Sequence, residues 1–177
     1  MEIVVTAGAG CGPTELAAFD RALAEAGIGN LNLIPLSSVI PAQSMVILGQ
    51  PRVTEDQWGH RAYVVIAERR ESRSGDQAWA GLGWVIDEDT GAGLFVEHVG
   101  QSDAAVRADI TASLEAMKSW RARTLGPIHM LTMGATCSCE PVCSLVAAVF
   151  RIEGWGPDDP FQAAEQGVLS LDVTGRS

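Results

Sequence analysis

The sequence predicts a domain of the α+β class, in which strands outnumber helices and the helices cover the sheet. Two observations predict this class. Apolar and β-branched runs of strand length recur throughout the 177 residues, whereas only two segments carry apolar residues at helical spacing. Three of the strand-like runs follow one another between the two helices, which favours hairpins over repeated strand–helix–strand crossovers.

Strands are predicted where apolar and β-branched residues lie between turn-forming residues. The expected strands span residues 2–7, 30–36, 60–68, 78–86, 93–99, 128–137 and 141–151. Residues 87–91 join two of these strands as a hairpin loop. The length fits one compact domain over residues 1–177 that buries a core of its own.

Two helices are predicted, at about 14–26 and at 102–123. Gly27 and Gly29 end the first helix, as glycine commonly does at a helix C-terminus. Ser102 is a good N-cap residue for the second helix. The apolar stripe of the second helix consists of Val106, Ile110, Leu114, Met117 and Trp120.

Composition and charge argue against several classes of function. No apolar run is long enough to cross a bilayer, and the segment after Met1 lacks the basic and apolar parts of a signal peptide. We therefore expect a cytoplasmic protein without membrane partners. The formal net charge is −10 and no basic tract occurs, which argues against nucleic acid as a partner. An acidic surface attracts cationic ligands, although the same charge also serves ordinary solubility.

The four cysteines do not form a recognised metal motif. Cys137, Cys139 and Cys143 are spaced C-x-C-x3-C, which differs from paired C-x2-C knuckles, and no histidine lies close to them in sequence. Disulfides are not expected in a chain without an export signal. The apolar residues that follow Cys143 indicate that this cysteine enters a buried strand. We expect no metal centre.

Asp20 is the first candidate for chemistry. In the first helix Leu16, Asp20, Leu23 and Gly27 fall on one stripe, so the Asp20 carboxylate is expected within or at the edge of the apolar face. A carboxylate there needs a donor, and a guanidinium would supply a planar, bidentate one. The donor could equally be one of the chain's own arginines, or water at the edge of the stripe.

The segment from Asn32 to Pro41 contains the second candidate. Ser37 and Ser38 close an apolar strand and are followed at once by another apolar pair and Pro41, which ends strand pairing. We expect a tight, partly buried junction in which a backbone bond could be held under strain. The same residues would also be compatible with an ordinary strand–loop–strand connection.

Glu97 is the third candidate. It follows an apolar run on a short strand and shares a face with Phe95, whereas Leu94, Val96 and His98 share the other face. A carboxyl group among apolar neighbours would hold its proton more tightly, as suits a general acid. The alternative is a solvated strand face.

Together these segments resemble the pyruvoyl-dependent arginine decarboxylase family. The resemblance is carried by Phe19-Asp-x-Ala-Leu-x-x-Ala-Gly-Ile-Gly-Asn30, by Asn32-Leu-x-x-x-Ser-Ser-x-Ile-Pro41 and by Gly93-x-x-x-Glu97. It covers most of the chain up to about residue 152. Ala42, where a second proline is common in such proteins, and the cysteine-rich segment depart from the family pattern.

The resemblance implies a role for each candidate residue. Ser38 would become a covalent pyruvoyl group, and Ser37 would become the new C-terminus of a chain 1–37, with 38–177 as the second chain. Asn32 would position the junction and the substrate, Asp20 would bind the substrate guanidinium, and Glu97 would be the proton donor. The implied fold is a four-layer αββα sandwich, assembled as a trimer of cleaved protomers or a dimer of trimers, with active sites between subunits.

The implied reaction is decarboxylation of arginine to agmatine through a Schiff base between the pyruvoyl ketone and the substrate amine. The product would serve polyamine synthesis or acid resistance. Lysine or ornithine remains an alternative substrate, whereas aspartate would meet Asp20 with like charge. Two other classes compete with this interpretation: an uncleaved, non-catalytic ligand-binding module, and a serine hydrolase. The hydrolase lacks support because no G-x-S-x-G motif occurs.

Overall fold

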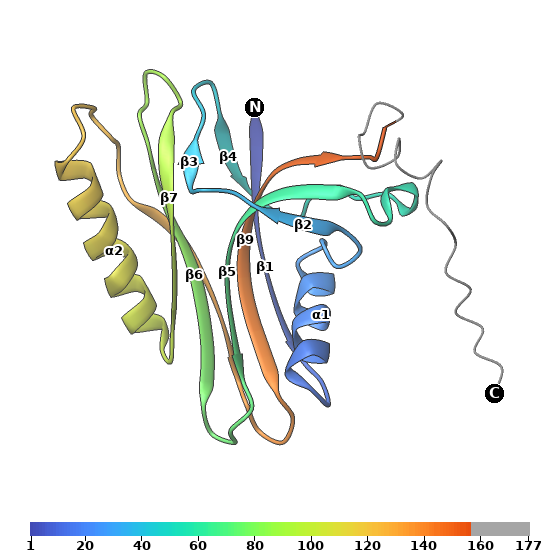
Figure 1. Cartoon of the computed structure of the whole chain (residues 1–177). Coiled ribbons are helices and arrows are strands. Elements are labelled where there is room, and N and C mark those ends of the chain that lie inside the picture. Colours follow the sequence, from blue (N-terminus) through green and yellow to red (C-terminus); the bar gives the residue numbers. More distant parts are fainter. Residues whose placement is uncertain (157–177) are drawn as a thin grey trace, which may run out of the picture.

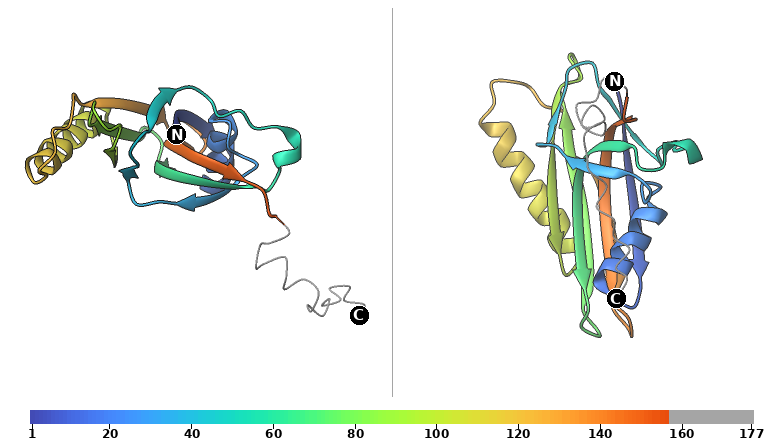
Figure 2. Two further views of the ribbon diagram at one scale, coloured as in Figure 1. Left: turned by 90° about the horizontal axis from the view of Figure 1, so that it is seen from above. Right: turned by 45° about the vertical axis from the view of Figure 1, so that its right-hand side comes forward.

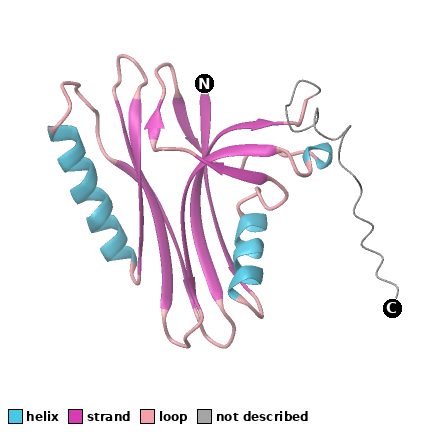
Figure 3. Ribbon diagram, in the orientation of Figure 1, coloured by secondary structure: helices cyan, strands magenta, loops and turns pink. Residues whose placement is uncertain are grey.

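The structure is a computed structural model that describes residues 1–156 and contains two sheets and two α-helices. The strands are β1 (Glu2–Cys11), β2 (Asn32–Pro35), β3 (Val39–Ile40), β4 (Met45–Leu48), β5 (Arg61–Glu71), β6 (Gln77–Ile86), β7 (Gly93–Gly100), β8 (His129–Thr136) and β9 (Val142–Glu153). The helices are α1 (Glu15–Glu25) and α2 (Asp103–Ser119), and a single 3-10 turn, η1, spans Glu55–Gln57. The predicted α+β class is confirmed (Figure 1, Figure 3).

The strands form a five-stranded sheet in the order β2-β5-β9-β1-β4 and a four-stranded sheet in the order β3-β7-β6-β8. The β1–β4 and β2–β5 pairs are parallel, and the other pairs are antiparallel. The predicted hairpin around residues 87–91 joins β6 to β7. By contrast, β5 and β6 are consecutive in the chain but belong to different sheets. The three predicted strands between the helices, which correspond to β5, β6 and β7, therefore do not form one meander.

One apolar core lies between the two sheets. Phe95 of β7 and Phe150 of β9 meet edge to face there, with ring centroids 5.9 Å apart. Trp84, Ile3 and Val65 belong to the same cluster. Separate clusters join α1 to the five-stranded sheet and α2 to the four-stranded sheet. The two helices therefore lie on opposite outer faces, as Figures 1 and 2 show.

Helix α1 packs on β1 through small residues. Ala18 and Ala22 are fully buried, and a Cβ placed on Gly8 would lie 2.1 Å from the Ala22 carbonyl oxygen. Thr14 caps the helix by accepting a hydrogen bond from the Ala17 amide. The predicted stripe is confirmed only for Leu23, which is buried, because the alanine face, which can approach the glycines of β1 closely, turns toward the sheet and leaves Asp20 exposed. Leu16, on the predicted stripe, is 67% exposed.

Helix α2 follows its prediction more closely. Ser102 is its N-cap, and Val106, Ile110 and Leu114 are fully buried against the four-stranded sheet. The helix ends at Ser119, four residues earlier than predicted. Trp120 consequently leaves the apolar stripe and is 76% exposed.

The remaining predicted strands are present with shifted ends, whereas β3 and β4 were not predicted because they are very short. Among residues 1–156, neither α-helix combines the length and the apolar character that a membrane span requires. A single domain extending through residue 177 stays a prediction, since residues 157–177 lie outside the described part of the chain.

Candidate functional site

The Ser37–Ser38 peptide lies where the chain passes from one sheet to the other. Strand β2 pairs with β5, and the Leu36 amide continues that pairing by donating to the Val64 carbonyl at 2.8 Å. Strand β3 pairs with β7, and the Ser38 carbonyl accepts a hydrogen bond from the Phe95 amide at 2.8 Å. The chain on each side of the peptide is thus held by a different sheet. Figures 1 and 2 show this passage between β2 and β3.

Two further hydrogen bonds define the junction. The Ser38 hydroxyl donates to the Glu97 carboxylate on β7, which brings together two candidates 59 residues apart in sequence. The Val39 amide donates to the Ser37 carbonyl oxygen at 2.6 Å, which closes a three-residue turn around Ser38. Ser38 is half-buried, in agreement with the predicted tight junction, while Ser37 is exposed.

Backbone strain at the junction, which the sequence suggested, is not found in the dihedral angles. Among residues 1–156 the non-glycine residue with positive φ is Gln43, at 60°, and no peptide bond is cis. The turn around Ser38 therefore has a negative φ at its centre and is of the low-energy, inverse type. The Ser37–Ser38 peptide is therefore distinguished by the hydrogen bonds that orient the Ser38 hydroxyl and the Ser37 carbonyl, and not by backbone strain.

Glu97 is exposed, so the expectation of a buried carboxyl group is wrong for the single chain. Its neighbours follow the predicted faces: Phe95 enters the core between the sheets, and Leu94 and Val96 face α2. However, β3 pairs with β7 only opposite Gly93 and Leu94. Beyond Phe95, β7 is the edge of the sheet, and the Glu97 side chain reaches solvent beside Ser38.

Asn32 lies at the start of β2, away from the junction. Its side-chain amide donates to the Gly59 carbonyl at 2.6 Å, and its main-chain amide donates to the His60 carbonyl at 2.7 Å. A carbonyl can only accept, so the Nδ2 atom must face Gly59 and the Oδ1 atom points elsewhere. Within residues 1–156, no hydrogen bond connects Asn32 to Ser37 or Ser38.

Asp20 is exposed on α1, and no ion pair to it forms within residues 1–156. The predicted alternative of pairing with one of the chain's own arginines is therefore not realised in the described part of the chain. Asp20 borders a pocket of about 480 Å³ that is otherwise lined mainly by apolar side chains, among them Leu16, Phe19 and Leu23. A carboxylate at the rim of an apolar pocket suits a ligand with an aliphatic stem and a cationic end.

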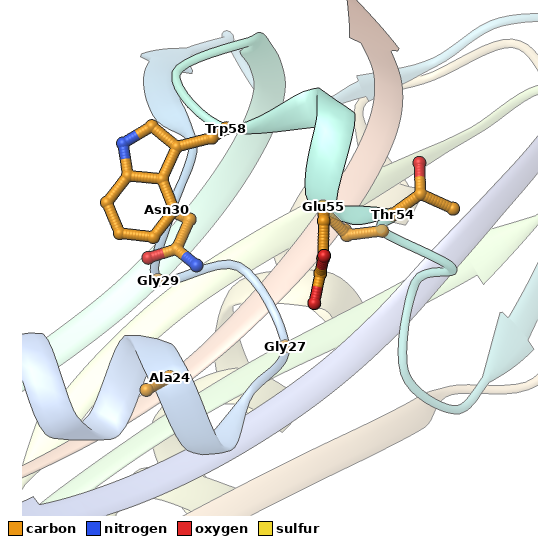
Figure 4. A pocket seen from close by; sticks show the side chains of 8 residues that line it. Ala24, Gly27, Gly29, Asn30, Thr54, Glu55 and Trp58 are labelled. Carbon is orange, nitrogen blue, oxygen red and sulfur yellow. The ribbon is translucent and has the colours of Figure 1, made fainter.

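A second cleft, of about 540 Å³, lies between the end of α1 and the η1 turn. Figure 4 shows the Glu55 carboxylate, the Asn30 amide and the Trp58 ring around it. Gly59, which follows Trp58, accepts the hydrogen bond from the Asn32 side chain. Trp58 is 73% exposed. A carboxylate beside an aromatic face attracts organic cations. The sequence analysis missed these residues, and the signal that could have found them is a tryptophan within an otherwise polar run.

The cysteines show no sign of shared chemistry. Cys143 lies fully buried in β9, which confirms the prediction for this residue. Burial, and secondarily the nearby Glu68 carboxylate, raise the pKa of the Cys143 thiol to about 12, so the thiol stays protonated. The described residues, 1–156, hold no group of three side chains placed to bind a metal ion.

Comparison with known proteins identifies the family. Residues 2–150 match the family model for pyruvoyl-dependent arginine decarboxylase. The chain belongs to the pyruvoyl-dependent arginine decarboxylase family. Its relatives of that name include a protein of Methanothermobacter thermautotrophicus, which is 31% identical over 121 residues, covering 68% of this chain and 78% of the relative. A relative of Pyrococcus horikoshii is 38% identical over 151 residues, or 82% of this chain and 92% of that protein.

Membership in the pyruvoyl-dependent arginine decarboxylase family implies an enzyme with a covalent pyruvoyl group. The surroundings of Ser38 fit such a group. Its carbonyl is held by the Phe95 amide, its side chain faces the Glu97 carboxylate, and its half-buried position leaves access from solvent. A ketone at residue 38 would therefore be fixed on one side and open to a substrate on the other.

Proposed function

We propose that the chain cleaves itself between Ser37 and Ser38 and then decarboxylates L-arginine to agmatine and carbon dioxide. The observation that carries this proposal is the contact between the Ser38 hydroxyl and Glu97 at a junction held by both sheets. The names of the relatives support the reaction and the substrate. A decarboxylase of another cationic amino acid is the nearest alternative.

Self-cleavage uses the groups of the junction in sequence. The Ser38 Oγ atom attacks the Ser37 carbonyl carbon, the carbon–nitrogen bond breaks, and the Ser38 nitrogen takes up a proton, which leaves an ester. Loss of the Ser38 α-proton then breaks the Cβ–Oγ bond and releases Ser37 as a carboxylate. The dehydroalanine that remains adds water and loses ammonia, so one water is consumed and no oxidant is required. Glu97 accepts the hydroxyl hydrogen bond that orients the attacking oxygen.

A pyruvoyl group at residue 38, held through its carbonyl by the Phe95 amide, would supply the electron-withdrawing ketone that decarboxylation of an amino acid requires. Glu97, left beside this position once the hydroxyl has gone, returns a proton to the substrate α-carbon. Glu97 is exposed in the single chain, whereas a general acid works best away from bulk water. This exposure supports a site that is completed by the surface of a neighbouring subunit.

Asp20 binds the far end of the substrate. The pocket beside it offers apolar side chains for the aliphatic stem and a carboxylate for the guanidinium. Neither Asp20 nor Asn32 forms a hydrogen bond with Ser38 in the described residues, which supports active sites between subunits of a trimer. One protomer then supplies Ser38 and Glu97, and its neighbour supplies Asp20 and Asn32.

The direct test is an intact-mass measurement of the native protein and of the Ser38→Ala variant. The native protein should give fragments of the size of 1–37 and 38–177, and phenylhydrazine should modify the second. The variant lacks the attacking oxygen and should stay full length. Fragments of the same size from the variant would remove Ser38 from its role. A single unmodified native chain would favour the uncleaved ligand-binding alternative.

A further inference from the structure

We propose that the main-chain amide of Val39 is the oxyanion donor for self-cleavage, acting on the carbonyl oxygen of Ser37 across the turn around Ser38. This inference rests on the proposed cleavage between Ser37 and Ser38. The acyl shift turns the Ser37 carbonyl oxygen into an oxyanion when the Ser38 hydroxyl attacks. The Val39 amide already donates to this oxygen, at an N···O distance of 2.6 Å.

The position of Val39 makes its amide available for this task. Val39 pairs with Leu94 of β7, but β3 is an edge strand, so it has a paired neighbour on one side only. The bonds that tie β3 to β7 here use the Ser38 carbonyl and the Phe95 amide. The Val39 amide is therefore not needed for pairing with β7 and turns back onto the Ser37 carbonyl.

The turn cannot relax easily, because both of its ends are held. Leu36 is bonded to β5 of one sheet, and the Ser38 carbonyl is bonded to β7 of the other. The Ser38 hydroxyl is held at the same time by Glu97. The attacking oxygen and the carbonyl oxygen that receives the charge are thus each hydrogen-bonded before the reaction. Such preorganisation lowers the barrier because no group must reorient as charge develops.

Charge development strengthens this hydrogen bond. A neutral amide–carbonyl bond becomes a charge-assisted one in the tetrahedral intermediate, and charge-assisted bonds are about twice as strong. Removing one oxyanion donor from an enzyme typically slows the reaction about 10²–10³-fold. We expect a loss of similar size in the rate of self-cleavage when the Val39 amide is removed.

The experiment follows freshly synthesised full-length precursor by intact mass over time, in three forms. Val39→Ala keeps the amide and should cleave at about the native rate. Val39→Pro removes the amide hydrogen and should cleave about 10²–10³-fold more slowly. Hydroxylamine, which intercepts esters, should release no additional fragment from the proline variant, because the block lies before the ester forms.

A backbone ester at position 39 covers the case in which proline disturbs the fold. Replacing Val39 by its α-hydroxy analogue removes the N–H and retains the side chain. The same exchange at Ile40 is the matched control, because it alters β3 without touching the Ser37 carbonyl. Equal cleavage rates for the native precursor and the position-39 ester would overturn the inference and leave the proposed function intact. Failure of the native precursor itself to cleave would instead overturn the proposed function.

Discussion

At the scale of single residues, two exposed carboxylates divide the proposed chemistry. Glu97 contacts the hydroxyl of Ser38, whereas Asp20 lies beside an apolar pocket on the outer face of α1. The first is placed to handle protons at the reacting carbon, and the second to recognise a cation at a distance from it. Each assignment predicts a different kinetic defect.

Replacement of Glu97 by glutamine should lower turnover and leave the fold unchanged. Glutamine keeps the shape and can accept the Ser38 hydrogen bond, but it has no proton to give to the substrate. We expect kcat to fall about 10²–10⁴-fold with little change in KM. Turnover should be expressed per ketone, titrated with phenylhydrazine, so that incomplete maturation does not count as lost catalysis. Full activity per ketone would exclude Glu97 as the proton donor.

Replacement of Asp20 by asparagine should change the choice of substrate. The exchange removes the negative charge and the bidentate acceptor that a guanidinium requires. In a panel of arginine, lysine and a neutral amino acid, kcat/KM for arginine should fall by at least about 10²-fold, a loss of about 3 kcal/mol. The neutral amino acid should be affected far less. An equal loss for every substrate would indicate a structural role for Asp20 instead.

The sequence alone could identify these residues as candidates, but it could not place them. Period 2 assigned Phe95 and Leu94 to opposite faces correctly, because strand geometry depends only on local sequence. The exposure of Glu97 depends on where β3 stops pairing with β7, which is a tertiary property. The hydrogen bond between Asn32 and Gly59 likewise joins residues 27 apart and has no local signal.

At the scale of elements, the position of α1 depends on the glycines of β1. Gly8 and Gly10 allow the helix backbone to approach the strand, and the buried Thr6 hydroxyl bonds the Ala26 carbonyl at 2.8 Å. This contact turns Ala18 and Ala22 inward and Asp20 outward. The pocket beside Asp20 therefore depends on a backbone contact on the opposite face of the same helix.

The exchange Gly8→Ala should destabilise the protein and displace α1. Its new methyl group would lie 2.1 Å from the Ala22 carbonyl oxygen, so strand and helix must separate. We expect the free energy of unfolding to fall by about 1–3 kcal/mol, as for other overpacked contacts, and KM for arginine to rise. Gly49→Ala is the matched control, because no atom lies within 4 Å of its added methyl group. Chemical denaturation of both variants measures the difference, and equal stability would contradict the close contact.

Helices and strands could be predicted where the apolar pattern extends over many residues. The prediction failed where packing against a neighbouring element determines which side chains are buried. The strands of eight to twelve residues and the Ser102 N-cap of α2 could be predicted from the sequence. The alanine face of α1 could not be predicted, because hydrophobicity favours Leu16, which is exposed, over alanine as a core residue. Only the glycines of a neighbouring strand explain why the smaller side chains lie inside.

At the scale of the whole molecule, the proposed cleavage falls at a connection between two sheets and not within one. Residues 1–37 contain β1, which lies between β9 and β4 in the five-stranded sheet. Both neighbours come from residues 38–177, so the two halves stay paired after the Ser37–Ser38 peptide is broken. Cleavage can therefore free the end at residue 38 without separating the fold.

The distribution of the candidate residues predicts how inactive variants combine. If each site takes Ser38 and Glu97 from one protomer and Asp20 from its neighbour, variants that damage different sides should complement each other. Ser38→Ala is expected to be inactive toward arginine, and Asp20→Asn is expected to be strongly impaired. In mixed oligomers, some interfaces would join an intact Ser38–Glu97 pair to an intact Asp20. Co-expression of the two variants should therefore restore a measurable fraction of native turnover.

The matched control combines Ser38→Ala with Glu97→Gln. These two residues touch within one chain, so each interface would take both from the same protomer and every interface would carry one defect. This pair should stay inactive, although it mixes as readily as the first, which differently tagged subunits and co-purification would verify. Rescue in both pairs, or in neither after verified mixing, would contradict a site shared between subunits. Rescue in the first pair alone would assign Asp20 to the protomer opposite Ser38, because no site within a single chain could then contain both residues intact.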